Sequence, residues 1–260
     1  MFLNFISFLH YLKRNYLRYS DIDESQIECY LIESVIKRLG DRHLTWRREH
    51  KCNSRKSVAP YEIHSFCCTE NKYFYIKIEE FTEMTPFAIS KLIDVSSTTI
   101  TNVILDLRNN TGGEIDYLNR FLELIYPYED LYITKDNSGN FCTIKKNAEK
   151  PTVALCFDRV YVLINKNTMS CAELLALAIR CMPNAVLIGE KTHGKGTICK
   201  SIFLSNDYHI FVPTHKFFNM FGETCDSIGV NPTVYCDDSV LDQMILNKDF
   251  SNLNLTISDN

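Results

Sequence analysis

The sequence lacks the features that mark nucleic-acid-binding, repetitive or disordered chains. Its 28 Lys and Arg residues are outnumbered by 32 Asp and Glu residues, so the formal net charge is -4. This balance provides no electrostatic footprint for nucleic acid. No internal repeat or low-complexity segment is present. With 45% hydrophobic and 23% charged residues, the 260-residue chain has the composition of a globular protein with one large domain or two small ones.

Neither a disulfide framework nor a metal site is indicated. The eleven cysteines form no C-x-x-C pair, and the adjacent Cys67 and Cys68 are poorly placed to bridge to each other. His193, His209 and His215 have no metal-ligand partners at recognisable spacing. We therefore expect free thiols, no metal ion and no cofactor.

Long hydrophobic runs are also missing, and no stretch reaches the length needed to span a bilayer. The first nine residues are largely apolar, but no basic residue precedes them and no small-x-small cleavage motif follows. Asn4, Ser7 and His10 instead mark one side of an amphipathic helix. A packed helix is favoured over an export signal or a membrane-surface helix. Together with the free thiols, this predicts a cytoplasmic protein without stable membrane insertion.

Periodicity divides the chain into four segments. They are a helical segment over 1–46, a polar and basic connector over 47–71, a core domain over 72–240 and a tail over 241–260. In the helical segment Ile27, Leu31 and Val35 recur every fourth residue, Asp23 can cap the helix, and Gly40 stands where a helix ends.

In the core, short apolar runs alternate with amphipathic ones, which predicts strands alternating with helices and therefore an α/β domain. The expected strands are Tyr73–Ile78, Val103–Leu107, Val160–Ile164, Ala185–Ile188, Ile198–Leu204 and His209–Pro213, and the expected helices cover 84–95, 116–126 and 171–182.

Ser170 is placed for nucleophilic chemistry, because it stands between a buried strand with its loop and the first turn of a helix. A helix N-terminus supplies unpaired N–H groups and a positive dipole end, which favour the oxyanion formed when a hydroxyl attacks a carbonyl. Taken alone, however, a serine at this position is more often a simple N-cap.

Lys195 lies 25 residues further along the chain, between Gly194 and Gly196. The glycines let backbone pass close to a reacting centre, and the lysine can then point inward. To act as a base the amine must be neutral, so its pKa must fall from about 10.4 by some 3 units through desolvation. Taken alone, Gly-Lys-Gly is more often a surface turn.

A glycine-bearing turn, Gly112-Gly113, follows the expected strand that ends at Leu107. Backbone N–H groups exposed by such a turn can form half of an oxyanion hole. The local alternative is an ordinary strand end followed by a tight turn.

Together, these three elements resemble the C-terminal processing (tail-specific) proteases in chain order and spacing. Three segments match their signatures D-L-R-N-N-x-G-G, the nucleophile motif and G-E-x-T-x-G-K-G: Asp106–Gly113, Ser170–Glu173 and Gly189–Gly196. Weaker matches flank them at Leu39–His43, Tyr75–Phe81 and Gly229–Pro232, so that the resemblance covers about residues 30–236. It implies an α/β core of the ClpP/crotonase-like spiral type and a peptide or protein substrate.

The resemblance further implies that Ser170 is the acylated nucleophile and Lys195 its general base. The oxyanion donors would be N–H groups of Gly112 or Gly113 and of Cys171, with Glu173 in a supporting position.

Two departures from the family pattern stand out. The glutamine that often follows the lysine by four residues is replaced by Cys199, and the connector over 47–71 is too short for the PDZ domain that usually grips the substrate C-terminus.

Several alternatives remain open from the sequence. His43 is a rival base, as in the tricorn-like branch of these proteases, and Cys171 is a rival nucleophile without a histidine tied to it by spacing. Gly189–Lys195 nearly matches a phosphate-binding P-loop, but Gly196 stands where the Mg²⁺-binding Ser or Thr is required. A peptide-binding module without turnover is the remaining alternative, and an oligomer is compatible with all of these readings.

Overall fold

The computed structural model describes residues 24–48, 64–70, 72–96, 98–147, 157–204 and 208–253. The chain forms two compact units: the first comprises residues 1–52 and 201–212, and the second comprises residues 53–200 and 213–260. Strands β9 (Thr197–Leu204) and β10 (Tyr208–Phe218) therefore contribute residues to both.

The first unit contains helix α2 (Glu24–Leu39) and strand β1 (Thr45–Arg48). The helix ends at Gly40, which has a φ of +64° and donates its N–H to Ile36 O at 3.2 Å. This confirms the helix and its end, while the expected cap at Asp23 lies outside the described residues. Strand β1, which begins near the end of the expected helical segment, pairs antiparallel with the first residues of β10, from Thr45 opposite Phe211 to Arg48 opposite Tyr208.

The second unit is organised around a six-stranded sheet of order β11-β8-β7-β4-β3-β2. The strands are β2 (Ser65–Cys68), β3 (Tyr73–Lys77), β4 (Asn102–Asp106), β7 (Arg159–Ile164), β8 (Ala185–Gly189) and β11 (Val234–Tyr235). Only β2 runs antiparallel to its neighbour in this sheet. Because the other five are parallel, their carboxyl ends lie along one edge.

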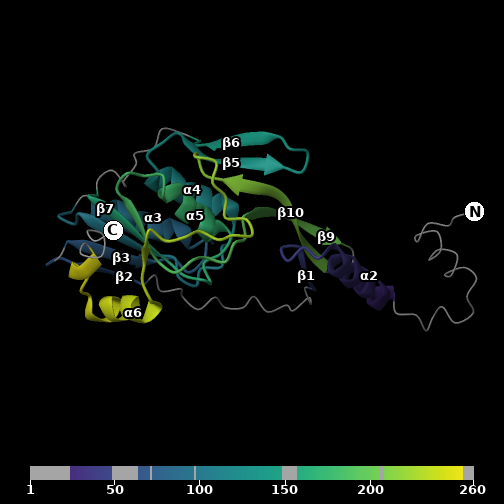
Figure 1. Cartoon of the computed structure of the whole chain (residues 1–260), viewed down its shortest axis with the longest axis horizontal. Coiled ribbons are helices and arrows are strands. Elements are labelled where there is room, and N and C mark those ends of the chain that lie inside the picture. The colour runs from purple at the N-terminus through teal and green to yellow at the C-terminus, as the bar shows by residue number, and fades with distance from the viewer. Residues whose placement is uncertain are drawn as a thin grey trace, which may run out of the picture. The chain divides into compact units, whose positions relative to one another are not determined.

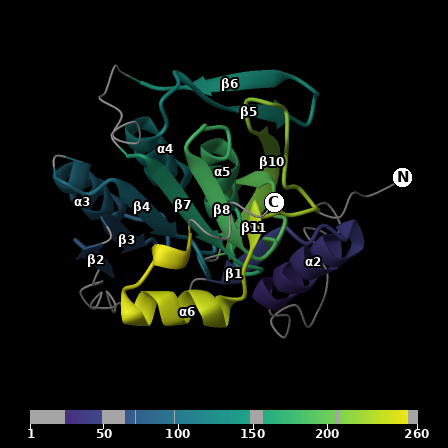
Figure 2. The same cartoon turned by 60° about the vertical axis from the view of Figure 1, so that its left-hand side comes forward.

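Helices cover both faces of this sheet, as Figures 1 and 2 show. The first face carries α3 (Thr85–Ser96), α4 (Ile115–Ile125) and α5 (Cys171–Ile179), and the second carries α6 (Asp238–Asn247) and the short 3-10 helix η3 (Ser251–Leu253). The expected α/β architecture is confirmed.

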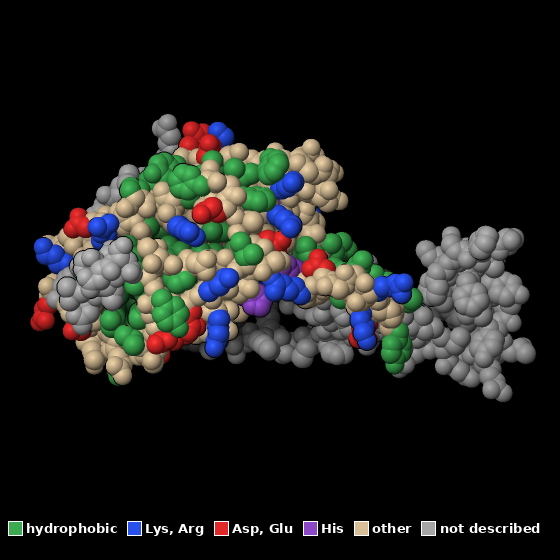
Figure 3. All heavy atoms as spheres, in the orientation of Figure 1, with side chains coloured by type: hydrophobic (Ala, Val, Ile, Leu, Met, Phe, Trp, Pro, Cys, Tyr) green, Lys and Arg blue, Asp and Glu red, His purple; other side chains and the backbone are tan. Residues whose placement is uncertain are grey.

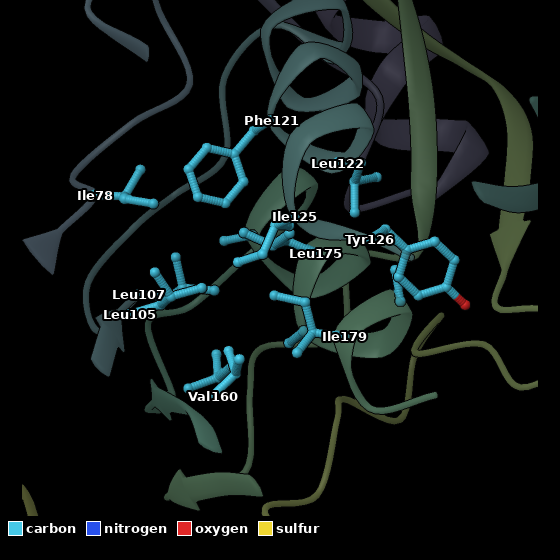
Figure 4. Packing of buried hydrophobic residues seen from close by; sticks show 14 of the residues in the cluster. Ile78, Leu105, Leu107, Phe121, Leu122, Ile125, Tyr126, Val160, Leu175 and Ile179 are labelled. Atoms are coloured by element: carbon cyan, nitrogen blue, oxygen red, sulfur yellow. The ribbon is translucent and has the colours of Figure 1, made fainter. Parts of the chain in front are cut away.

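The main hydrophobic core lies between the sheet and helices α4 and α5. Figure 4 shows Leu105 and Val160 from the sheet pointing toward Ile125, Leu175 and Ile179 from the helices. All five residues are fully buried. Strand β7 is buried over its last five residues, which is typical of a parallel strand covered on both faces.

Two strand features were not predicted. A hairpin of β5 (Asp130–Asp136) and β6 (Phe141–Lys145) pairs through β5 with the last residues of β10. Most of β6 is exposed, so it lacks the alternation of apolar residues that marks a half-buried strand. Strand β2 lies within the stretch 47–71, which was expected to be an unstructured connector, because its pairing with β3 overrides its weak local pattern.

Along the part of the chain that the structure describes, no helix is both long and apolar enough to cross a membrane. On the face of the second unit seen in Figure 3, Lys and Arg side chains are spread among acidic and uncharged ones. This surface therefore shows no single basic field of the kind that binds nucleic acid.

Candidate active site

Ser170 lies directly before α5 in a strained backbone conformation. Its φ is 58° and its ψ is -120°, a combination that non-glycine residues rarely adopt. Such a conformation costs about 1–3 kcal/mol and is typical of functional turns between a strand and a helix. The side chain is half-buried. Because Ser170 follows β7, it lies at the carboxyl edge of the sheet.

The loop before Ser170 is fastened to the end of β4. Thr168 Oγ1 donates to Leu107 O at 2.9 Å, and Met169 N donates to Asn110 O at 2.9 Å. The Asn110 side chain donates in turn to Ile78 O at 2.8 Å. These bonds bring the nucleophile loop and the glycine turn, which are far apart in sequence, to the same edge.

The Gly112-Gly113 turn packs against Ser170. A Cβ atom added to Gly112 would lie 2.9 Å from Ser170 Cβ, and the φ of Gly112 is +113°. The N–H of Gly112 donates to Asn110 Oδ1 at 2.8 Å, whereas those of Gly113 and Cys171 have no oxygen acceptor among the described residues. The N–H group of Gly112 is thus already engaged, so Gly113 and Cys171 remain of the expected oxyanion donors.

Glu173 is the residue that joins the nucleophile to the lysine loop. This fully buried carboxylate accepts hydrogen bonds from Ser170 N at 3.0 Å and from Lys195 N at 2.7 Å. It also accepts from Gly194 N at 2.7 Å and from Thr192 Oγ1 at 2.5 Å. Four donors converge on one side chain, so Glu173 fixes the separation between the two motifs.

The Lys195 side chain is half-buried at this position. No carboxylate oxygen of a described residue lies within 4.0 Å of its Nζ atom. Its charge acts on the neighbouring Cys171 thiol, lowering the pKa of that thiol against the larger effect of burial. The Lys195 side chain therefore lies close enough to Cys171, the residue after Ser170, to act on it electrostatically.

The two glycines beside Lys195 have a different role from the expected one. Cβ atoms added to Gly194 and Gly196 would lie 2.9 Å from Gly229 N and 2.4 Å from Asp226 N. The glycines thus allow the lysine loop to pack tightly against residues 225–229, and not against the reacting centre. The closing segment Gly229–Pro232 and the lysine motif are thus in direct contact at Gly229.

The Cys171 thiol is poorly suited to act as a nucleophile. Burial raises its pKa to about 12, and Sγ donates to Gly113 O at 3.2 Å. A thiol with this pKa is protonated at neutral pH, and the thiolate is the reactive form. Cys199, on β9, is half-buried and lies close enough to influence the same thiol.

His43 belongs to the first unit, so its role as an alternative base stays a prediction. Within that unit Arg42 Nε donates to His43 Nε2 at 3.1 Å. In the second unit, Lys195 is followed by β9 and not by a helix, which is incompatible with a P-loop. No group of three potential metal ligands occurs among the residues that the structure describes.

Sequence reasoning assigned no role to Asn110 and Thr192. Thr192 Oγ1 donates to Glu173 and accepts from Val230 N at 2.6 Å, so it joins the lysine loop to the closing segment. Both residues lie inside the motifs that carry the family resemblance. Their positions in those motifs were the signal from which a supporting role could have been predicted.

A serine on a strained strand-to-helix turn, with free N–H groups beside it and a lysine loop tied to it, is the arrangement of a serine hydrolase. The chain belongs to peptidase family S41, whose model matches residues 72–236.

Curated relatives are named for processing of carboxyl termini. Carboxyl-terminal-processing peptidase 3 of Arabidopsis thaliana is 28% identical over 176 residues, which cover 65% of this chain and 33% of the relative. The carboxyl-terminal-processing protease of Synechocystis sp. is 33% identical over 144 residues, which cover 55% and 31%. The chain thus spans about a third of the length of these relatives.

Among solved structures, the photosystem II D1 C-terminal processing protease is similar, with a TM-score of 0.57 and 26% identity. The match covers 65% of this chain and 43% of that protease.

Proposed function

We propose that this protein is a serine endopeptidase or processing peptidase that forms an acyl-enzyme on Ser170 with Lys195 as general base. The observation that carries the proposal is the bonding of Glu173 to the backbone of both residues. A dyad requires its two members at a fixed separation, and a buried carboxylate with four donors provides it.

In the proposed reaction, neutral Lys195 takes the proton of Ser170 Oγ while this oxygen attacks the substrate carbonyl carbon. The tetrahedral intermediate places its oxyanion at the N–H groups of Gly113 and Cys171. Collapse breaks the peptide C–N bond, and Lys195 returns the proton to the leaving amine. Water then attacks the acyl-enzyme by the same route, with Lys195 again accepting a proton, and Ser170 is regenerated.

The surroundings of Lys195 support its use as a base. Lys195 is half-buried and has no carboxylate partner within 4.0 Å among the described residues. The Glu173 carboxylate, which accepts from the backbone N of Lys195, is engaged by further backbone N–H groups and a hydroxyl group.

The free thiols support a reduced, cytoplasmic location. None of the eight cysteines whose state the structure describes forms a disulfide. The substrate would be a peptide or a protein, as for the relatives named carboxyl-terminal-processing peptidases.

Hydrolysis of a fluorogenic peptide library by wild type and variants tests the proposal. We expect Ser170→Ala to abolish turnover and Lys195→Ala to lower kcat/KM by about 10²–10⁴-fold. His43→Ala should stay close to wild type. Loss of activity in His43→Ala but not in Lys195→Ala would assign the base to the histidine. Peptide binding without any turnover by wild type would instead favour a binding module on the same fold.

A further inference from the structure

A cavity of about 860 Å³ opens at the carboxyl edge of β3 and β4, apart from the Ser170 site. Its lining includes residues from β2 and β3, from α3 on one face of the sheet and from α6 on the other. Figure 2 shows these two helices on opposite faces of the sheet. Phe87, Lys91 and Lys248 line it and are exposed, so it is open to solvent. Its volume is within the range of roughly 300–1,000 Å³ that is usual for ligand sites.

The charged groups of the cavity are unequally paired. Arg108 pairs with both acidic lining residues, with Asp106 at 2.8 Å and Asp242 at 2.9 Å. Lys77 has Glu79 at 3.6 Å. Among the described residues, Lys91 and Lys248 have no carboxylate partner. Lys91 and Lys248 are therefore the two lysines of the lining that pair with no described carboxylate.

The wall beside these lysines is apolar. Phe66, Phe87 and Ile245 contribute to the lining, and Phe87 has a relative exposure of 58%. Lys248 Nζ lies 5.2 Å from the centroid of the Phe66 ring. The apolar wall and the ammonium groups of Lys91 and Lys248 are together complementary to a ligand that carries carboxylates next to apolar side chains.

The cavity also lies on the same edge as the nucleophile. Strands β3, β4 and β7 are consecutive and parallel, and Ser170 follows β7. Neighbouring strands are about 4.8 Å apart, so β3 and β7 are separated by roughly 10 Å. An extended peptide rises about 3.3 Å per residue. A peptide acylating Ser170 would reach the cavity with only a few further residues.

We propose that this cavity binds an acidic segment of the peptide substrate. Its carboxylates pair with Lys91 and Lys248, and a neighbouring apolar side chain packs on Phe66 and Phe87. The proposal rests on the peptidase function in one respect, namely that the bound peptide is the substrate. It assigns substrate selection to the sheet domain itself, at residues outside the catalytic machinery.

Binding to the Ser170→Ala variant tests this without turnover. The probes are fluorescein-labelled decapeptides that differ only in having Phe-Glu-Glu or Phe-Gln-Gln near the C-terminus, each with a free or an amidated end. We expect fluorescence anisotropy to show roughly tenfold tighter binding of a carboxylate-bearing probe than of the amidated Gln probe at low salt. Comparing Glu with Gln, and free with amidated ends, separates side-chain carboxylates from a terminal one.

Charge reversal locates the site. Lys91→Glu and Lys248→Glu, each introduced into the Ser170→Ala background, should remove the preference for the acidic probes. Lys72→Glu is the matched control, because Lys72 is an exposed lysine next to the opposite end of β3. Its preference should be unchanged.

Equal binding of the acidic and neutral probes would overturn the proposal, and so would a preference that survives both charge reversals. The peptidase function fails separately, if wild type binds the acidic probe but never cleaves a peptide. With active enzyme, Lys91→Glu and Lys248→Glu should raise KM for acidic substrates roughly tenfold and leave kcat unchanged.

Discussion

Ser170 and Cys171 are adjacent, and their environments give them opposite reactivity. Ser170 is half-buried on a strained turn, whereas Cys171 is buried with its thiol bonded to Gly113 O. Because burial raises the pKa of Cys171 to about 12, its thiolate is scarce at any pH at which the protein is expected to work. At the residue scale, this difference favours the proposed assignment of the Ser170 hydroxyl as the nucleophile over the Cys171 thiol.

Replacing Cys171 by alanine tests this assignment. We expect Cys171→Ala to retain kcat/KM within about threefold, because its backbone N–H stays in place and the lost thiol makes no covalent step. Steady-state hydrolysis between pH 6 and 9 checks it. A loss as large as that of Ser170→Ala would mean that the thiol takes part in the reaction.

At the scale of elements, α5 and the lysine loop are held together by Glu173. Each carboxylate oxygen accepts from two donors, so replacing one oxygen with an NH₂ group leaves two donors facing a donor, and the loop is expected to shift. Glu173→Gln should lower kcat by up to about a hundredfold with little change in KM, because a small displacement of a catalytic group is costly.

The matched control is Glu129→Gln, since the Glu129 side chain has a relative exposure of 77%. It should have wild-type kinetics. A Glu173→Gln enzyme with normal kcat and only a lower melting temperature would reduce Glu173 to a structural residue.

Helix α6 is tied to the sheet edge by Arg108. The guanidinium group pairs with Asp106, which is fully buried, and with Asp242 of α6. Arg108→Met leaves the Asp106 carboxylate buried without its counter-ion, and such losses cost about 3–5 kcal/mol. Urea unfolding should show a decrease of that order in the free energy of unfolding.

Asp242→Asn provides the comparison for Arg108, because the Asp242 side chain has a relative exposure of 68%. Its effect should stay below about 1 kcal/mol. Equal effects of the two substitutions would show that the buried Asp106 pair is not the anchor.

For the whole molecule, local pattern and motif spacing predicted the elements that position the site. Strand β4, helix α5 and strand β8 were expected from apolar runs, and Ser170 and Lys195 from their place beside them. Pairing across the chain could not be predicted in the same way. Which of Gly112 and Gly113 can donate to an oxyanion depends on the hydrogen bond from Gly112 N to Asn110 Oδ1. Strand β6 forms because it pairs with β5. The proposed division at 46, 71 and 240 stays a prediction.

The thiol state is a prediction for the entire chain. Eight cysteines of the described residues form no disulfide, and the spacing of all eleven predicts none. Ellman titration of the denatured protein, purified without reductant under argon, should count eleven thiols per chain. Nine or fewer, rising to eleven after reduction, would reveal a disulfide.

Covalent labelling reports on the nucleophile and its base together. Intact mass and peptide mapping after reaction with a fluorophosphonate should show one adduct per chain, located on Ser170. Ser170→Ala should remain unlabelled, and Lys195→Ala should react about 10²–10⁴-fold more slowly than wild type. An adduct that persists in Ser170→Ala, or a Lys195→Ala variant that reacts at the wild-type rate, would contradict the Ser170–Lys195 mechanism.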